Sequence, residues 1–190
     1  MFIRYVDEGL ERLIRDRLPL PEDLGDVSFE MPTGTWSAQI SRLTVNFFLF
    51  QVDRSNQPTR SAQSRTTAEG RPERRAPLPM VELSYLVSTW AGSLRDEHEL
   101  LGQVTSLLSG ITALPEPYAA PGLNSSVTLS LGGEGGAGGV RPREVWQGVG
   151  GSLKAGLMLR ATVATDSWEW TDEPAAVQRI AVLADRMSDQ

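Results

Sequence analysis

The fold is decided by residues 79–90, which read PMVELSYLVSTW. Alternate positions from Val81 to Thr89 carry apolar or β-branched side chains, while Leu86 and Trp90 stand among polar residues on the opposite side. This alternation predicts a β-strand. Leucines at helical spacing follow an acidic cluster and predict a helix over residues 96–111. Ser93, three residues before Asp96, resembles the start of a capping box for that helix.

Other segments continue this mixture of strands and helices. Residues 44–53 read TVNFFLFQVD, and their nearly continuous apolar character predicts a strand in the middle of a sheet with both faces covered. Residues 2–17 form an amphipathic pattern whose polar face has mixed charge, which favours a helix packed on a sheet over one on a membrane surface. We predict further strands over 27–29, 125–131 and 153–165, and further helices over 141–149 and 174–187. The order indicates one α+β domain, a mixed or antiparallel β-sheet with flanking helices.

The composition excludes several classes of protein. With 190 residues, 40% of them hydrophobic, the chain can build one substantial core. No apolar run approaches the ~20 residues that a membrane span requires, and acids occupy the place of a signal peptide's apolar region. Cysteine is absent, so no disulfide framework is possible. We expect a cytoplasmic protein without a membrane partner. The net charge of −6 argues against nucleic acid as its main partner.

Two segments have a biased composition. Residues 54–77 contain six arginines, two glutamates and no aliphatic side chain larger than alanine, so we predict a long mobile loop. Such a loop is either simply solvated, or a basic arm that orders against an acidic protein surface, or a nucleic-acid contact. The candidate interface consists of five of these arginines with two tryptophans near the C-terminus: Arg60, Arg65, Arg71, Arg74, Arg75, Trp168 and Trp170. The glycine tract at 132–139 predicts a second flexible loop.

The sequence offers no convincing catalytic, metal or cofactor site. Residues 133–138 match G-x-G-x-x-G by letter, but Pro142 interrupts the helix that a dinucleotide-binding turn requires, and glycine-rich tracts match this pattern by chance. His98 is the single histidine of the chain and has no second histidine or cysteine with which to hold zinc. We therefore expect a protein that is not an enzyme and needs no cofactor.

Residues 83–90 (LSYLVSTW) and 97–102 (EHELLG) resemble the cap, or tail-terminator, family of phage-tail-like contractile injection systems. That family has an L-x-Y-L-V-x-x-W strand, an E-H-x-L-L-G helix and a Leu-Pro exit, matched here by Leu114 and Pro115. An N-terminal helix, a V-N-x-x-L-x-x-V strand, an Arg/Pro-rich loop, a short helix with Trp146 and a closing strand agree in order. The resemblance covers most of residues 1–165, a cap domain, and leaves 166–190 as a C-terminal extension.

The resemblance implies a mechanical function. Proteins of this kind form a six-fold ring on the distal end of the inner tube and sheath, end polymerisation and hold the sheath extended. The implied partners are other copies of the chain, as a homo-hexamer, together with the sheath protein and the inner tube protein. An adaptor that uses the same fold without closing a ring is the alternative. A small enzyme that depends on His98 is a third hypothesis.

Overall fold

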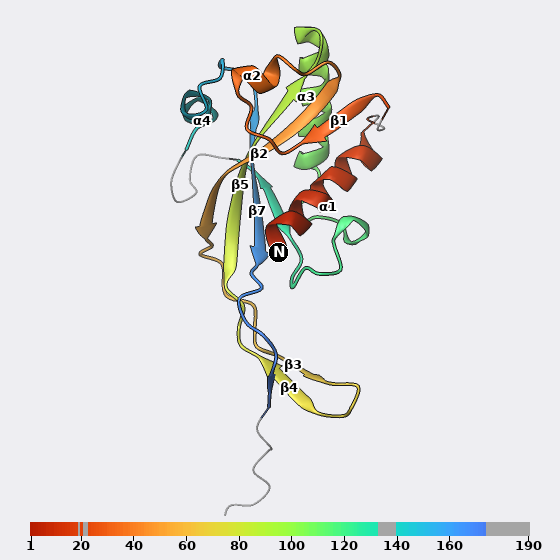
Figure 1. Ribbon diagram of the computed structural model, residues 1–190, viewed down its shortest axis with the longest axis vertical. Coiled ribbons are helices and arrows are strands. Elements are labelled where there is room, and N and C mark those ends of the chain that lie inside the picture. Colours follow the sequence, from red (N-terminus) through yellow and green to blue (C-terminus); the bar gives the residue numbers. More distant parts are fainter. Residues whose placement is uncertain (19, 21–22, 133–139, 174–190) are drawn as a thin grey trace, which may run out of the picture.

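The computed structural model describes residues 1–18, 20, 23–132 and 140–173 and has the predicted α+β architecture (Figure 1). A five-stranded mixed sheet has the order β1-β2-β5-β7-β6, in which β1 runs parallel to β2 and all other neighbours are antiparallel. Its strands are β1 (Gly25–Ser28), β2 (Leu43–Arg54), β5 (Met80–Trp90), β6 (Thr128–Leu131) and β7 (Leu157–Ala164). The predicted strands therefore form, with boundaries that shift by a few residues.

Strand β5 lies at the centre of this sheet and contributes to two apolar clusters. Leu83, Tyr85 and Val87 belong to the main core and are fully buried. Leu86 and Trp90 point to a smaller cluster on the opposite face. The alternation of residues 79–90 thus assigned the two faces correctly, because successive side chains of a strand point to opposite sides.

Helices α1 (Phe2–Arg17) and α3 (Leu94–Ser109) cover the face that holds the main core. α1 begins and ends where the sequence predicts, and α3 begins two residues earlier than predicted. Ser93 Oγ accepts a hydrogen bond from the Asp96 amide at 3.2 Å, which satisfies one of the free donors at the helix start. Gly9 lets the connection that contains the 3₁₀ turn η1 (Glu116–Tyr118) approach α1, because a Cβ there would lie 2.6 Å from Leu114 Cδ2.

The opposite face is covered by α4 (Pro142–Gly148) and the single-turn helix α2 (Gly34–Ser37) (Figure 1). Three tryptophan rings meet there edge to face: the ring centroids of Trp36 and Trp90 are 5.3 Å apart, and those of Trp90 and Trp146 are 6.1 Å apart. α2 is not among the helices predicted from the sequence. Thr33 Oγ1 accepts from the Trp36 amide and starts this helix, which brings its tryptophan onto the sheet.

The prediction that both faces of residues 44–53 are covered is correct for the first half of β2 only. Residues 44–47 are buried, but burial falls along the strand, and Val52 is 48% exposed. The reason is the short neighbour: β1 pairs with β2 only from Leu43 to Asn46. A bulge at Phe50 then shifts the register against β5, and strands with bulges bend more strongly.

The prediction of a long loop over residues 54–77 was wrong. Within it, β3 (Gln63–Thr66) and β4 (Pro72–Arg75) form an antiparallel hairpin, and β8 (Thr171–Asp172) adds to β4 as a third strand. The segment has no apolar core, but cross-strand polar and aromatic contacts replace one. We call residues 54–77 the arm. Figure 1 shows it projecting from the end of the five-stranded sheet where β2 ends and β5 begins.

Two predictions concern residues that the structure does not describe, and a third concerns the end of the cap domain. The predicted helix over 174–187 and nearly all of the glycine loop at 132–139 lie outside the described residues. The boundary between a cap domain and an extension at residue 165 stays a prediction. Beyond that boundary, Thr171 and Asp172 pair with the arm, so this part of the chain is attached to the hairpin.

Candidate protein-docking surface

The base of the arm is fixed to the body by main-chain hydrogen bonds. Arg60 and Leu78 form an isolated antiparallel bridge, in which each amide donates to the other's carbonyl at 3.0 and 3.2 Å. Leu78 is 1% exposed and so anchors the returning strand in the body. The backbone of Arg60 is therefore held in place, while its side chain is exposed.

Trp170 lies between two arginines of the hairpin. The Cζ atoms of Arg65 and Arg75 lie 4.3 and 4.8 Å from the centre of the indole ring. A guanidinium at this distance from an aromatic ring is attracted to it by about 0.5–1 kcal/mol at exposed sites. We call these three side chains the stack; they connect β3, β4 and the segment that leads into β8.

Polar contacts complete the stacked face of the arm. Arg65 Nε donates to Glu73 Oε2 at 2.7 Å across the hairpin. Arg75 donates from Nη2 to Gln63 Oε1 at 2.7 Å and from Nη1 to Asn124 Oδ1 at 3.0 Å, which joins the arm to the body. Arg65 and Arg75 thus hold the arm together, and their guanidinium groups are largely committed within the chain.

The other three predicted arginines, Arg60, Arg71 and Arg74, are exposed. Their side chains form no hydrogen bond or ion pair with any part of the chain that the structure describes. We call them the outer arginines. Of the two predicted tryptophans, Trp170 is in the stack, and Trp168 is 52% exposed and contacts no other ring among the described residues. The structure therefore divides the predicted interface into an internal part and a free part.

The sequence does contain a signal for the hairpin. Residues 67–70 read TAEG, and Gly70 adopts a φ of 80°, which favours glycine. The Gly70 amide donates to Thr67 O, and Thr67 and Arg71 are joined by a further main-chain bond, so the chain reverses here. A glycine-ended turn between two polar runs is typical of a hairpin.

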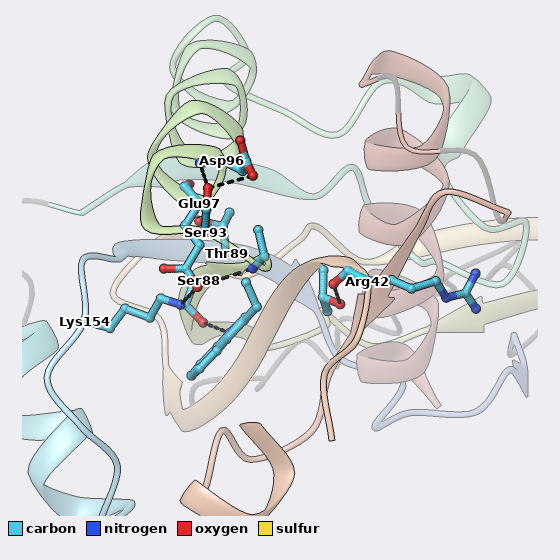
Figure 2. A network of polar contacts seen from close by, with 10 residues as sticks. Arg42, Ser88, Thr89, Ser93, Asp96, Glu97 and Lys154 are labelled. Carbon is cyan, nitrogen blue, oxygen red and sulfur yellow. Dashed lines mark hydrogen bonds and ion pairs between the residues drawn. The ribbon is translucent and has the colours of Figure 1, made fainter. Parts of the chain in front are cut away.

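A second polar cluster, at the end of the sheet away from the arm, was missed by sequence reasoning. Lys154 Nζ donates to Glu97 Oε1 at 2.5 Å and lies 3.7 Å from the centre of the Trp90 ring. Glu97 Oε1 also accepts from the Ala91 amide, and Thr89 Oγ1 donates to the Glu97 carbonyl. Figure 2 shows how these contacts join the end of β5, the first turn of α3 and the segment before β7.

This cluster has a structural explanation. Burial lowers the pKa of Lys154 more than its bond to Glu97 raises it. The side chains of Lys154 and Glu97 are only 16% and 14% exposed, so the two charges neutralise each other where water is scarce. His98, the neighbour of Glu97, is exposed and forms no hydrogen bond or ion pair with the described residues. The histidine is therefore not part of this network.

The described residues contain no group of three His, Asp or Glu side chains placed to hold a metal ion. Over the same residues, no helix combines the length and the apolar character that crossing a bilayer demands. What the described surface does offer is the arm, with exposed guanidinium groups on a hydrogen-bonded hairpin.

A mixed sheet with helices on both faces and a projecting polar arm defines a small α+β module (Figure 1). The chain belongs to the Pvc16 N-terminal domain family, whose model matches residues 5–179. A comparison with curated proteins finds no match.

Two solved structures have the same fold. One is the sheath/tube terminator, in the extended state, of the extracellular contractile injection system PVC; it has 18% sequence identity and a TM-score of 0.70, and the alignment covers 99% of this chain. The other is the tube-terminating cap of the anti-feeding prophage, with 14% identity, a TM-score of 0.62 and 94% of this chain covered. The chain spans 65% and 60% of the length of these two proteins.

Proposed function

We propose that this protein is a structural cap of a contractile injection system. It forms a ring of six copies on the distal end of the inner tube and sheath, ends polymerisation there and holds the sheath extended. It acts in the cytoplasm, where the particle assembles, and works by binding rather than by catalysis.

The observation that carries this proposal is the likeness of nearly the whole chain to two terminators. The family model spans residues 5–179, and 99% of the chain aligns with the PVC sheath/tube terminator. The identity of 18% is low, so the support comes from the fold together with the family, and not from shared surface residues. Because the chain spans 65% of that terminator, contacts made by the remainder of that protein are not assigned to this chain.

The arm gives the proposal a physical basis. A terminator must bind the last layer of an assembly and offer no equivalent surface to a further layer. The outer arginines provide exposed guanidinium groups that can form charge-assisted hydrogen bonds with carboxylates of the tube, the sheath or a neighbouring copy. Since Arg is the side chain best suited to planar, bidentate pairing with carboxylates, these positions are suited to a protein interface.

The test is electron microscopy of particles from cells that lack the gene, with tube length and end structure scored for each particle. We expect overlong or ragged tubes, or sheaths that contract early. Supplying the gene on a plasmid should restore uniform length, and so should His98→Ala, because termination requires no histidine chemistry.

Particles of normal length with normal ends in the deleted cells would contradict the proposal. They would instead favour an adaptor that binds the assembly without closing a ring. A His98→Ala protein that is folded but fails to restore particle length would point to chemistry at that residue.

A further inference from the structure

The two faces of the arm differ in whether their charged side chains are paired within the chain. Register places Gln63 opposite Arg75 and Arg65 opposite Glu73, and places Asp172 beside Glu73 on the same face. This is the face that carries the stack: Arg65 pairs with the Glu73 carboxylate, and Arg75 donates to the amide oxygens of Gln63 and Asn124. The stacked face is thus nearly neutral and satisfied by contacts within the chain.

The opposite face of the arm is polar and positive. Its strand positions are Ser64 and Thr66 on β3, Pro72 and Arg74 on β4 and Thr171 on β8, none of them acidic; Glu173, whose amide donates to the Pro72 carbonyl, follows β8 on this side. Arg71, whose carbonyl accepts from the Thr67 amide at the tip of the hairpin, lies by register on the same side as Glu73 but is exposed like Arg74. The charges of Arg71 and Arg74 are therefore available to a partner, in contrast to those of Arg65 and Arg75 in the stack.

The arm is also well prepared for binding. Its backbone is fixed by the hairpin bonds, by β8, by the Arg60–Leu78 bridge and by the bond from Arg75 to Asn124. A segment that is already ordered loses less conformational entropy when it docks than a free loop does. The outer arginines consequently need to order little more than their own side chains.

The charge of the rest of the chain indicates which partner the outer arginines can bind. Residues 54–77 contain six arginines and two glutamates, a net charge of +4. We call residues 1–53 and 78–165 the body. The body contains ten basic and sixteen acidic side chains, a net charge of −6. Seven exposed carboxylates of the body have no ion-pair partner among the described residues: Asp23, Glu30, Asp53, Asp96, Glu99, Glu116 and Glu144. Figure 1 shows the arm directed away from its own body, and none of these carboxylates pairs with an outer arginine within one copy.

We propose that the outer arginines of one copy dock onto the acidic body of a second copy of this chain. The surfaces in contact differ, arm on one copy and body on the other, so the contact is head-to-tail. Contacts of this type close into a ring when the rotation between copies allows it. The proposal deepens the cap function and rests on it only for ring closure, since the contact between two copies can be tested on the purified protein alone.

The experiment places a photo-crosslinking amino acid at Ser64, an exposed position on the face of Arg74. The purified full chain is irradiated across a range of concentrations, and crosslinked peptides are identified by mass spectrometry. We expect a covalent dimer that joins residue 64 to a peptide of the body. Arg71→Glu combined with Arg74→Glu should lower the dimer yield about fivefold or more, because like charges then meet at the contact.

A control with the same change in net charge is Arg95→Glu with Arg143→Glu, two exposed arginines of the body. These substitutions make the body more acidic, so the dimer yield should not fall. Thermal unfolding of both double variants verifies that the body is folded.

The proposal is overturned if no dimer forms at any concentration, if the crosslink joins arm to arm, or if both double variants lose yield equally. A crosslink to the tube or sheath protein in assembled particles, without one between copies, also overturns it. None of these results alters particle length in cells that lack the gene, so failure of this inference is distinguishable from failure of the cap function.

Discussion

At the scale of single residues, the contact between Asp7 and Tyr85 is informative. Tyr85 is fully buried, and its hydroxyl donates to Asp7 Oδ1 at 2.7 Å from beneath α1. Burial raises the pKa of the Asp7 carboxyl more than this hydrogen bond lowers it, and burial also raises the pKa of the Tyr85 hydroxyl. Asp7 therefore gives the buried Tyr85 hydroxyl a hydrogen-bond acceptor, but its own carboxyl group is poorly solvated there.

This arrangement predicts a pH-dependent stability. A carboxyl group whose pKa is raised in the folded state binds its proton more tightly when the protein is folded. Its contribution to stability is therefore complete below the ordinary carboxyl pKa of about 3.9 and is lost as the pH rises through the pKa of the folded state. We expect wild type to lose stability relative to Asp7→Asn as pH rises from about 4 to about 7. Urea unfolding of both proteins across this range measures the difference.

The control is Asp23→Asn, which removes the charge of an exposed carboxylate. A difference between wild type and Asp7→Asn that stays constant over the pH range would contradict the prediction. Asp7→Ala leaves the Tyr85 hydroxyl buried without an acceptor, and we expect it to cost about 1–3 kcal/mol of unfolding free energy near pH 4, a cost that shrinks as pH rises and wild type loses stability.

At the scale of elements, the arm depends on few contacts. β8 contributes a two-residue pairing with β4, and the stack joins the same segment to both strands of the hairpin. Because the arm projects from the sheet, its order should not determine the stability of the main core (Figure 1).

Trp170→Ala removes the aromatic surface on which both arginines lie. We expect amide exchange in residues 63–75 to become about fivefold faster or more, since two contacts of about 0.5–1 kcal/mol each are lost. The melting temperature of the body should stay nearly unchanged. Hydrogen exchange measured by mass spectrometry tests the arm, and Trp168→Ala is the matched control because Trp168 is exposed. Equal exchange rates in the two variants would refute a role of the stack.

At the scale of the whole molecule, charge is distributed unevenly between a positive arm and a negative body. Attraction between exposed charges falls as salt shortens the screening length from about 10 Å at 0.1 M to about 3 Å at 1 M. We therefore expect purified protein to cap the uncapped particles of deleted cells more slowly at high salt. Capped ends are counted by electron microscopy at successive times. The Arg71→Glu, Arg74→Glu protein should cap slowly at both salt concentrations; equal capping rates for wild type at both would contradict the prediction.

The sequence by itself determined the main sheet and its covering helices. Residues 2–17 and 79–90 have patterns in which nearly every side chain agrees with one period, so their buried and exposed faces follow from the sequence alone. Such agreement is possible because side chains point to the same face at a fixed repeat along a helix or a strand, so burial follows that repeat. The five arginines and two tryptophans of the candidate interface could also be chosen from composition alone.

Tertiary structure decided how those interface residues are used. The arm lacks apolar periodicity, so the turn that ends at Gly70 is the one local signal of its hairpin, and Trp170 lies about a hundred residues along the chain from Arg65 and Arg75. Their contact, like that of Lys154 with Glu97, arises when the sheet brings distant segments together. Whether an arginine is held within the chain or left free for a partner is thus a property of the folded arrangement, because a guanidinium pairs with whatever carboxylate or ring the fold places beside it.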